Sequence, residues 1–407
     1  MTKQADSTPN KISHAWVALP LAFLVVGVFR GIRSPNAWSM THYLLTYEEG
    51  PTKRALSGEV FRLLGSELAS SYYFWASLSY LVLFFNIGLL ILLLIESTRH
   101  AHRWYAMASV IFCAGPSLVF LAHTVGYAEQ LGLLVTLVTM RISRWFEKYA
   151  FTLVACPLLI CIHEAHLLLF YPVILFSLML TMDDPVRQKR WMLGQVLICI
   201  LTTAVMGNAT LSVHEAAQLY EVIQARADFH LRADVFSTLH RTGLDNLRAV
   251  WHVRVVQGTW DNLMLSFLAL IVPAAYLVLC FYWMTLRRSI LWYSGLAVFC
   301  APLGLHVLGW DEMRWNGIAL CHLFLVITHV SGSAPNDEQN IPPTWFLSRP
   351  FWASVLILVS LMPFPMFDGY TSTQNPVLRA VEYVDELAKG KRLIPGPRDR
   401  HRPGYKI

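Results

Sequence analysis

Residues 149–182 read YAFTLVACPLLICIHEAHLLLFYPVILFSLMLTM, an apolar run broken only by the cluster His163-Glu164-Ala165-His166 and by Pro172. One continuous helix over these 34 residues would be about 51 Å long, whereas the hydrocarbon core of a bilayer is about 30 Å thick. The run therefore predicts a hairpin of two short helices with the polar cluster at its tip. A single tilted helix with a buried polar belt is the alternative.

The rest of the chain has the same apolar character. Of its 407 residues, 55% are hydrophobic and 14% are charged, against about 25% charged residues in soluble domains. This composition predicts an all-α fold, a polytopic transmembrane helical bundle in a lipid bilayer. We expect about 11 spans, several of them shorter than the ~20 residues of a full crossing. They cover 16–32, 72–95, 105–122, 131–141, 149–162, 167–182, 191–207, 262–286, 289–308, 317–331 and 351–367.

The distribution of Lys and Arg predicts the orientation, because short basic loops favour the cytoplasmic side. With a cytoplasmic N-terminus, four basic connections lie inside, and the polar clusters and the C-terminus lie outside. The tail runs against this pattern because it is basic. We expect one transmembrane helical domain over residues 1–367 and a basic C-terminal tail over 368–407. The inner connections hold Arg99 and Arg103; Arg141, Arg144 and Lys148; Arg187, Lys189 and Arg190; and Arg287 and Arg288.

Two long segments, about 33–71 and 208–261, do not read as spans and are predicted to lie on the outer face. The second contains Ser212 followed three residues later by Glu215, which is a capping-box pattern. A helix is therefore predicted to begin there and to lie along the membrane interface. Both segments are expected to contain interfacial helices.

The first outer segment carries the strongest candidate for chemistry. Glu48 and Glu49 precede the turn Gly50-Pro51, and Lys53 and Arg54 follow it. Two carboxylates beside two cations could act as a general base next to a phosphate clamp. The alternative is an ordinary solvated loop.

The hairpin tip is the second candidate. His163 and His166 are three residues apart and could face the same way on a helical turn, beside Glu164. They could form a polar relay or part of a phosphate or metal site, or they could simply close the hairpin by hydrogen bonds. The spacing is not that of the zinc-protease helix. No cofactor is indicated, and a divalent metal is a minor alternative.

A third cluster lies at an outer boundary, where Asp311, Glu312 and Arg314 stand between Trp310 and Trp315. Aromatic rings stack on the apolar faces of sugars and carboxylates hold their hydroxyls, so the cluster suits a sugar. Aromatic belts are also expected at this depth regardless of function.

Two weaker groups of polar residues remain. His123, Tyr127 and Glu129 lie on a short loop without cations, and packing or polar capping explains them adequately. The second outer segment supplies several arginines, of which one or two could bind phosphate.

Several function classes are disfavoured. The chain has no phosphate-cradling Gly-rich loop, no dinucleotide fingerprint and no Gly-x-Ser-x-Gly elbow. Its net charge of +6 is better explained by membrane orientation than by nucleic-acid binding.

These features resemble the polytopic glycosyltransferases of the GT-C class, which use lipid-phosphate-linked sugars and place an acidic residue in the first outer loop. Glu48 and Glu49 occupy that place here. The stretch from Tyr47 to Gly58 also resembles a Tyr-acid-Gly-x-x-Lys-Arg-x-Leu-x-Gly pattern of uncharacterised bacterial envelope proteins, in which a later His-Glu pair recurs. His163-Glu164 fits that pair. The best-known GT-C members differ in commonly using Asp and in often carrying a larger C-terminal soluble domain.

The resemblance implies an enzyme of the bacterial inner membrane, a multi-pass glycosyltransferase with a periplasmic active face. It would move a sugar from a polyprenyl-phosphate-linked donor to an envelope glycan, lipid or protein, with Glu48 or Glu49 as base and inversion at the anomeric carbon. The remaining candidate residues would bind the substrate or its phosphate: Lys53, Arg54, His163, Glu164, His166, Asp311, Glu312 and Arg314.

Two other functions stay open. One is a transporter or flippase for a lipid-linked glycan, although no internal repeat is visible and the charges gather at one face. The other is an envelope acyltransferase with His163 as base.

Overall fold

The computed structural model describes residues 14–65, 67–100, 103–258, 260–285, 288–309, 311–333, 343–364 and 366. Every regular element within these residues is helical, which confirms the all-α prediction for them. The tail over 368–407, Trp310 and Arg287 lie outside the described residues.

The elements before the hairpin tip are α1 (His14–Gly31), α2 (Ala37–Leu44), α3 (Leu56–Leu63), η1 (Glu67–Ser70), α4 (Tyr72–His100), α5 (Arg103–Ala114), α6 (Pro116–His123), α7 (Glu129–Arg141) and α8 (Trp145–Ile162). The elements after it are α9 (His166–Leu169), α10 (Tyr171–Leu180), α11 (Pro185–Asn208), α12 (Val213–Arg226), α13 (Ala233–Phe236), α14 (Gly243–Trp251), η2 (His252–Val256), α15 (Asp261–Thr285), α16 (Ser289–Cys300), η3 (Pro302–Val307), α17 (Glu312–Ser333) and α18 (Arg349–Leu361).

The protein is a multi-pass membrane protein. Among the described residues, 5 helical stretches are long and apolar enough to cross a bilayer, and α5 with α6 makes a sixth if that pair, bent by 50°, is one span. The expected count of about 11 spans stays a prediction. The 5 stretches are Tyr72–Glu96, Trp145–Ile162, Pro185–Asn208, Leu263–Thr285 and Ser289–Val307, and the shorter apolar helices are Trp16–Gly31, Tyr171–Leu180 and Arg349–Leu361.

Helix α17 lies at the centre of the bundle and packs against α15, α16, α10 and α6. Its consecutive residues from Leu323 to Ile327 are all 0% exposed, which requires neighbours on every face of the helix. Phe324 stacks on Phe112 of α5 with ring centroids 4.0 Å apart. This core holds α17 rigidly, and with it the polar residues at its N-terminal end.

The predicted hairpin of residues 149–182 is confirmed. Helix α8 ends at Ile162, the chain turns through residues 163–165, and α9 and α10 lead back. The Nζ of Lys148, near the start of α8, donates to the Oγ of Ser177, near the end of α10, at 3.1 Å. The two arms are therefore antiparallel, and His163 to His166 lie at the tip.

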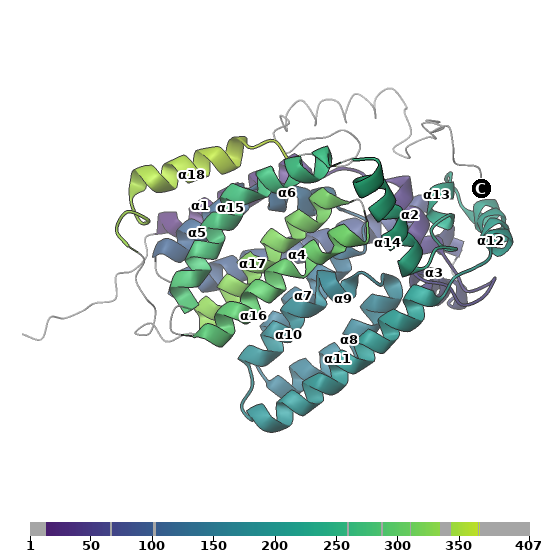
Figure 1. The fold of residues 1–407 in the computed structure, drawn as a ribbon, viewed down its shortest axis with the longest axis horizontal. Helices are drawn as coiled ribbons and strands as arrows, with labels where there is room; N and C mark the ends of the chain where they lie inside the picture. The colour runs from purple at the N-terminus through teal and green to yellow at the C-terminus, as the bar shows by residue number, and fades with distance from the viewer. Residues whose placement is uncertain are drawn as a thin grey trace, which may run out of the picture.

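Short helices gather at one end of the bundle, which we call the site end (right in Figure 1). They come from the two predicted outer segments: α2, α3 and η1 from the first, and α12, α13, α14 and η2 from the second. The capping box at Ser212 is present and begins α12 as predicted. Leu219 and Ile223 of α12 are buried in the same apolar cluster as Met40 and Tyr43 of α2, so the two segments pack together.

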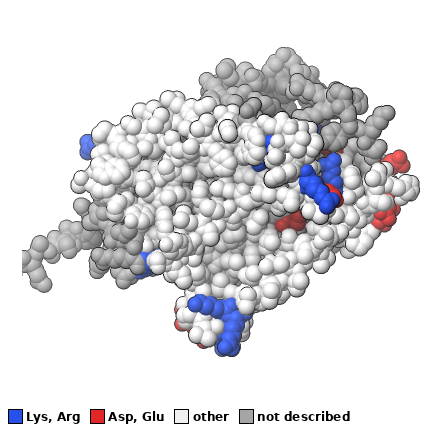
Figure 2. All heavy atoms as spheres, viewed as in Figure 1, with Lys and Arg blue, Asp and Glu red and all other residues white. Residues whose placement is uncertain are grey.

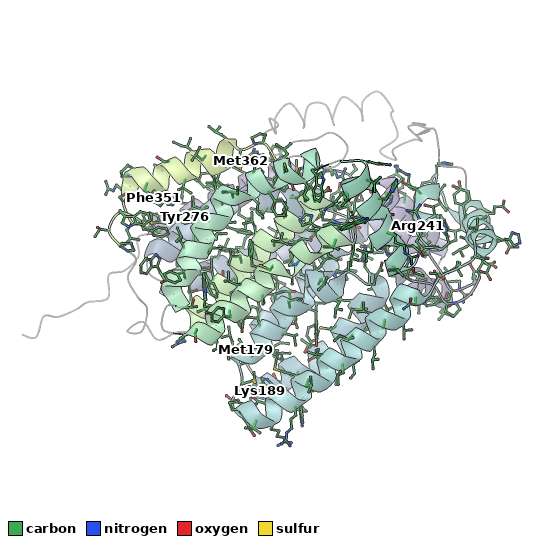
Figure 3. All side chains as sticks on the ribbon, in the orientation of Figure 1. Met179, Lys189, Arg241, Tyr276, Phe351 and Met362 are labelled. Carbon is green, nitrogen blue, oxygen red and sulfur yellow. The ribbon has the colours of Figure 1, made fainter. Side chains whose placement is uncertain are left out.

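The opposite end of the bundle carries the basic connections. Figure 3 shows Lys189 near the start of α11 and Arg241 beyond its other end, at the site end. Figure 2 shows charged atoms grouped at these places, with a broad uncharged surface between them. This distribution agrees with the expectation that the basic connections and the polar clusters face opposite sides of the membrane.

The contact between α1 and α6 depends on Gly31. A Cβ atom at this position would lie 2.1 Å from the backbone oxygen of Val119 and 2.8 Å from the Cβ of Ala122. We expect Gly31→Ala to lower the melting temperature of the detergent-solubilised protein, because backbone atoms must shift. Gly194→Ala is the matched control, since nothing lies within 4 Å of its Cβ position on α11. Equal melting temperatures for the two variants would contradict this reading.

Candidate functional site

Arg54 joins the first outer segment to the hairpin tip. Its Nε donates to Oε2 of Glu164 at 3.0 Å, and its Nη2 donates to Oε1 at 2.6 Å. The side chains are only 13% and 20% exposed, so this is a largely buried, two-pronged ion pair. Arg54 also has a φ of 65°, a left-handed conformation that a non-glycine residue rarely adopts. Strain of this kind persists where the surrounding structure enforces it, often at functional sites.

His42 of α2 completes this junction. Nη1 of Arg54 lies 3.2 Å from Nε2 of His42, and Nδ1 of His42 lies 2.9 Å from the carbonyl oxygen of Trp38. A guanidinium only donates, so Nε2 accepts, and the N–H at Nδ1 donates a hydrogen bond to the carbonyl oxygen of Trp38. Desolvation and the charge of Arg54 lower the pKa of His42 to about 3. The ring is therefore neutral and orients Arg54. Sequence reasoning missed His42, although it stands 12 residues before Arg54.

Lys53 ties the first outer segment to the second. Its side chain donates a hydrogen bond to the carbonyl oxygen of Arg241, and its backbone N–H donates to the carbonyl oxygen of Ala209 at 3.3 Å. Burial lowers the pKa of Lys53 to about 8. This cation holds the two segments together and does not line the cavity described below.

The two first-loop carboxylates differ in their surroundings. Both oxygens of Glu48 accept from Nη1 of Arg226 on α12, at 2.9 and 3.0 Å. The side chain of Glu49 makes no hydrogen bond or ion pair with any described residue. Neither lines the cavity. Of the two, Glu49 is thus the one with free acceptor oxygens.

The histidines of the hairpin tip are both buried. Nδ1 of His163 accepts from the backbone N–H of Ala165 at 3.2 Å, so in the neutral ring Nε2 carries the proton. That Nε2 has no partner among the described residues. The ring of His166 lies 6.0 Å from that of His163. Desolvation is the main reason that the pKa of His166 falls to about 3 and that of His163 well below its ordinary value.

The predicted cluster at the start of α17 divides between two ion pairs. Nη2 of Arg314 lies 2.7 Å from Oδ2 of Asp311, whereas Glu312 pairs with Arg254 of η2 at 2.8 Å. Arg254 also donates to the carbonyl oxygen of Gly309 at 2.9 Å, so Glu312 helps to attach the second outer segment. Trp315 is 5% exposed and packs on the ring of His306, which removes it as an accessible platform for a sugar.

Glu129 is the acidic residue whose importance the sequence did not reveal. It begins α7, it is 1% exposed, and its Oε1 lies 3.3 Å from Nη1 of Arg314. Arg314 lies at the same time over the ring of Tyr127, at 5.7 Å from the ring centroid. A buried carboxylate beside a buried cation is uncommon, which makes Glu129 a candidate residue of the site.

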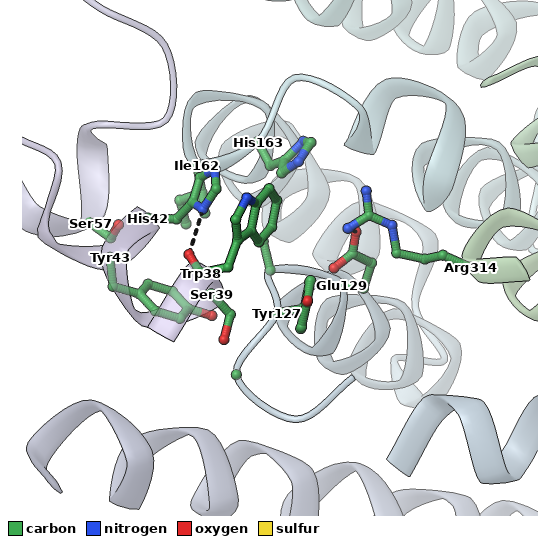
Figure 4. Close-up of a pocket in the computed structure, with 12 residues that line it drawn as sticks. Trp38, Ser39, His42, Tyr43, Ser57, Tyr127, Glu129, Ile162, His163 and Arg314 are labelled. Carbon is green, nitrogen blue, oxygen red and sulfur yellow. Dashed lines mark hydrogen bonds and ion pairs between the residues drawn. The ribbon is translucent and has the colours of Figure 1, made fainter. Parts of the chain in front are cut away.

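These residues surround a narrow cavity of about 20 Å³, which is room for about one water molecule (Figure 4). Of the residues predicted from the sequence, His163 and Arg314 line it. The walls are Trp38, Ser39, His42, Tyr43, Ser57, Gly126, Tyr127, Ala128, Glu129, Ile162, His163 and Arg314.

A larger apolar groove of about 350 Å³ adjoins the cavity. Tyr43, Ser57, Gly126, Tyr127 and Ile162 line both spaces. The remaining groove walls come mainly from α3 and α4, with contributions from α7 and α8, and are mostly apolar: Leu56, Val60, Phe61, Trp75, Leu78, Ser79, Val82, Gln130, Leu131 and Leu158.

No family model, curated protein or solved structure matches this chain. The chemistry of the site therefore has to be argued from its own residues. Within the described part of the chain, no group of three or more His, Cys, Asp or Glu side chains is placed to hold a metal ion. What the site offers is two guanidinium groups, a buried N–H donor and a buried carboxylate beside an apolar groove.

Proposed function

We propose that the protein transfers a sugar from a polyprenyl-phosphate-linked donor to a hydroxyl of an envelope glycan, lipid or protein. The observation that carries this proposal is the continuity of the charged cavity with the apolar groove, which share five lining residues. A substrate with a long apolar chain and a charged head requires both environments side by side. The apolar chain would lie in the groove, and the phosphate and sugar would lie where the groove meets the cavity, which itself has room for about one water molecule.

The cations would act on the phosphate. Arg314 lines the cavity, and Arg54 stands at its edge through its contact with His42. As the anomeric carbon–oxygen bond breaks, its electron pair moves onto the phosphate, whose negative charge nearby guanidinium groups stabilise. Such a leaving group needs no proton. The N–H of His163 would donate to an oxygen of the phosphate or the acceptor.

The acceptor must lose a proton as its oxygen bonds to the anomeric carbon with inversion. The sequence assigns this proton to Glu48 or Glu49. Because Arg226 holds Glu48, Glu49 is the better candidate of that pair. Donors of this class lie in the bilayer, which fits a multi-pass protein. We place the reaction on the periplasmic face of the bacterial inner membrane.

Filling the groove tests the proposal. We expect Ser79→Trp to weaken binding of radiolabelled polyprenyl phosphate to the purified protein by at least about tenfold, because Ser79 faces the groove and is 6% exposed. Leu81→Trp, on the same helix, is the matched control, since Leu81 is 52% exposed and does not line the groove.

Transfer is followed in parallel as consumption of the lipid-linked sugars of the host, by mass spectrometry of membrane lipid extracts. Equal binding by the two variants would contradict the placement of the lipid chain. Binding without any consumption of donor would favour a carrier over a transferase.

A further inference from the structure

The carboxylate of Glu129 lies at the cavity wall and can accept hydrogen bonds that no described residue donates. Neither of its oxygens accepts a hydrogen bond from a described residue, although the side chain is fully enclosed. Among the described residues, its close charged contact is Nη1 of Arg314 at 3.3 Å. Figure 4 shows the two side chains facing each other at the cavity.

Three other carboxylates of the site are occupied, and Glu49, whose oxygens are free of described partners, does not line the cavity. Glu164 accepts two hydrogen bonds from Arg54, and Glu48 accepts two from Arg226. Glu312 accepts one from Arg254. A buried carboxylate left without hydrogen bonds is costly and rare, so it calls for an explanation.

A hydroxyl group supplies what Glu129 lacks. An O–H donor placed in the cavity could reach a free oxygen of Glu129 and would lie beside Nε2 of His163, which is also unpartnered and lines the same cavity. Glu129 can accept a hydrogen bond and the N–H of His163 can donate one. A hydroxyl fits both, because it donates one hydrogen bond and accepts others. The cavity thus matches an alcohol of the kind that a glycosyl acceptor presents.

We propose that Glu129, rather than Glu48 or Glu49, is the catalytic carboxylate that takes the acceptor's proton. This inference rests on the proposed glycosyl transfer. The acceptor oxygen forms its bond to the anomeric carbon while the bond from that carbon to the phosphate oxygen breaks. The electron pair leaves with the phosphate, and the hydroxyl proton moves to Glu129. Arg314 offsets the charge of the carboxylate before this transfer.

The test compares Glu129→Gln with Glu49→Gln and Glu48→Gln in the purified full-length protein. Two quantities are measured: binding of polyprenyl phosphate, and the rate of donor consumption at saturating lipid extract. We expect Glu129→Gln to bind polyprenyl phosphate within about threefold of the parent and to lose at least about 100-fold in rate, in the range typical of a missing general base. Glu129→Asp should restore part of the rate and shift the acidic limb of the pH–rate profile, which a purely structural role would not do.

Several results would overturn the inference. One is a Glu129→Gln protein that keeps the parent's rate. A second is a loss confined to Glu49→Gln, which would return the base to the first outer segment. A third is Glu129→Gln losing polyprenyl phosphate binding and rate together, without rescue by Asp, which would make Glu129 a structural residue. If the unaltered protein neither binds polyprenyl phosphate nor consumes donor, the proposed function itself fails, and this outcome is visible without any variant.

Discussion

Replacing Glu164 by Gln is expected to destabilise the protein by about 3–5 kcal/mol and to abolish its activity. The substitution leaves the guanidinium of Arg54 buried without its charged partner, and removing one member of a buried ion pair has this magnitude. Arg54→Gln should have a similar effect from the other side. The pair also joins two parts of the chain 110 residues apart, so its loss separates the first outer segment from the hairpin tip. The melting temperature in detergent, with the rate of donor consumption, measures both effects.

The ion pair between Arg62 and Glu59 provides the control. It has similar geometry, with Nε and Nη2 of Arg62 donating to Glu59 at 3.0 and 2.5 Å, but it lies at the surface, with Arg62 39% exposed. Arg62→Gln should leave the melting temperature unchanged, because exposed pairs contribute little.

A double variant of Arg54 and Glu164 separates the cost of burying an unpaired charge from the attraction between the two charges. Arg54→Met combined with Glu164→Met should be more stable than either single change to Met, because neither leaves a lone buried charge. If the Glu164 and Arg62 variants melt at the same temperature, the Arg54–Glu164 pair does not stabilise the contact between the first outer segment and the hairpin tip.

Much of the fold was predictable, because local composition determines it. The apolar run over 149–182 is too long for one straight crossing, which favoured a turn at its polar cluster over a single tilted helix; the structure confirms that hairpin. The capping box of Ser212 with Glu215 likewise began a helix as expected. The number of membrane spans was harder to predict from the sequence. Helix α7, with 13 residues, is apolar but short, and sequence alone does not say whether such a helix crosses the membrane.

The site was predictable in part. Arg54 and Glu164 were expected at one pocket, and they make direct contact. His42 escaped notice and Glu129 was placed only in a weaker group, because a single acid or histidine near a helix end has a sufficient local explanation. What distinguishes Glu129 is a partner on α17, 185 positions along the chain, and a cavity that only tertiary packing creates. Glu312, in contrast, was expected at the substrate and is engaged by Arg254.

Acidification should destabilise the protein steeply below about pH 6.5. In the folded protein the pKa of His42 and of His166 is about 3, and that of His163 is well below its ordinary value, whereas unfolding returns each to about 6.5. Between these values the unfolded chain binds more protons than the folded one. Stability is therefore fully present above pH 6.5 and is lost as the pH falls toward 3, by up to about 1.4 kcal/mol per pH unit for each histidine.

Glu164 extends this loss to lower pH. Burial raises its pKa, but the charge and hydrogen bonds of Arg54 act together with its other neighbours, Lys53 among them, and hold the pKa well below its ordinary 4.5, so its contribution disappears below that value. Lys53 acts in a separate window. Because its pKa is lowered to about 8 from 10.5, its effect on stability changes only in alkaline solution.

Melting temperatures measured from pH 7.5 to pH 4.5 check this prediction, and His166→Gln isolates one of the three contributions. His166 is 1% exposed, so its replacement should flatten the decline of stability with acid. His214→Gln is the matched control, because His214 is exposed on α12 and its replacement should leave the decline as it is in the parent. A melting temperature that stays constant from pH 7 to pH 5 would mean that these rings take up protons in the folded protein as readily as in the unfolded chain. The pKa of His42 would then not be lowered, and the junction between the first outer segment and the hairpin tip would need another explanation.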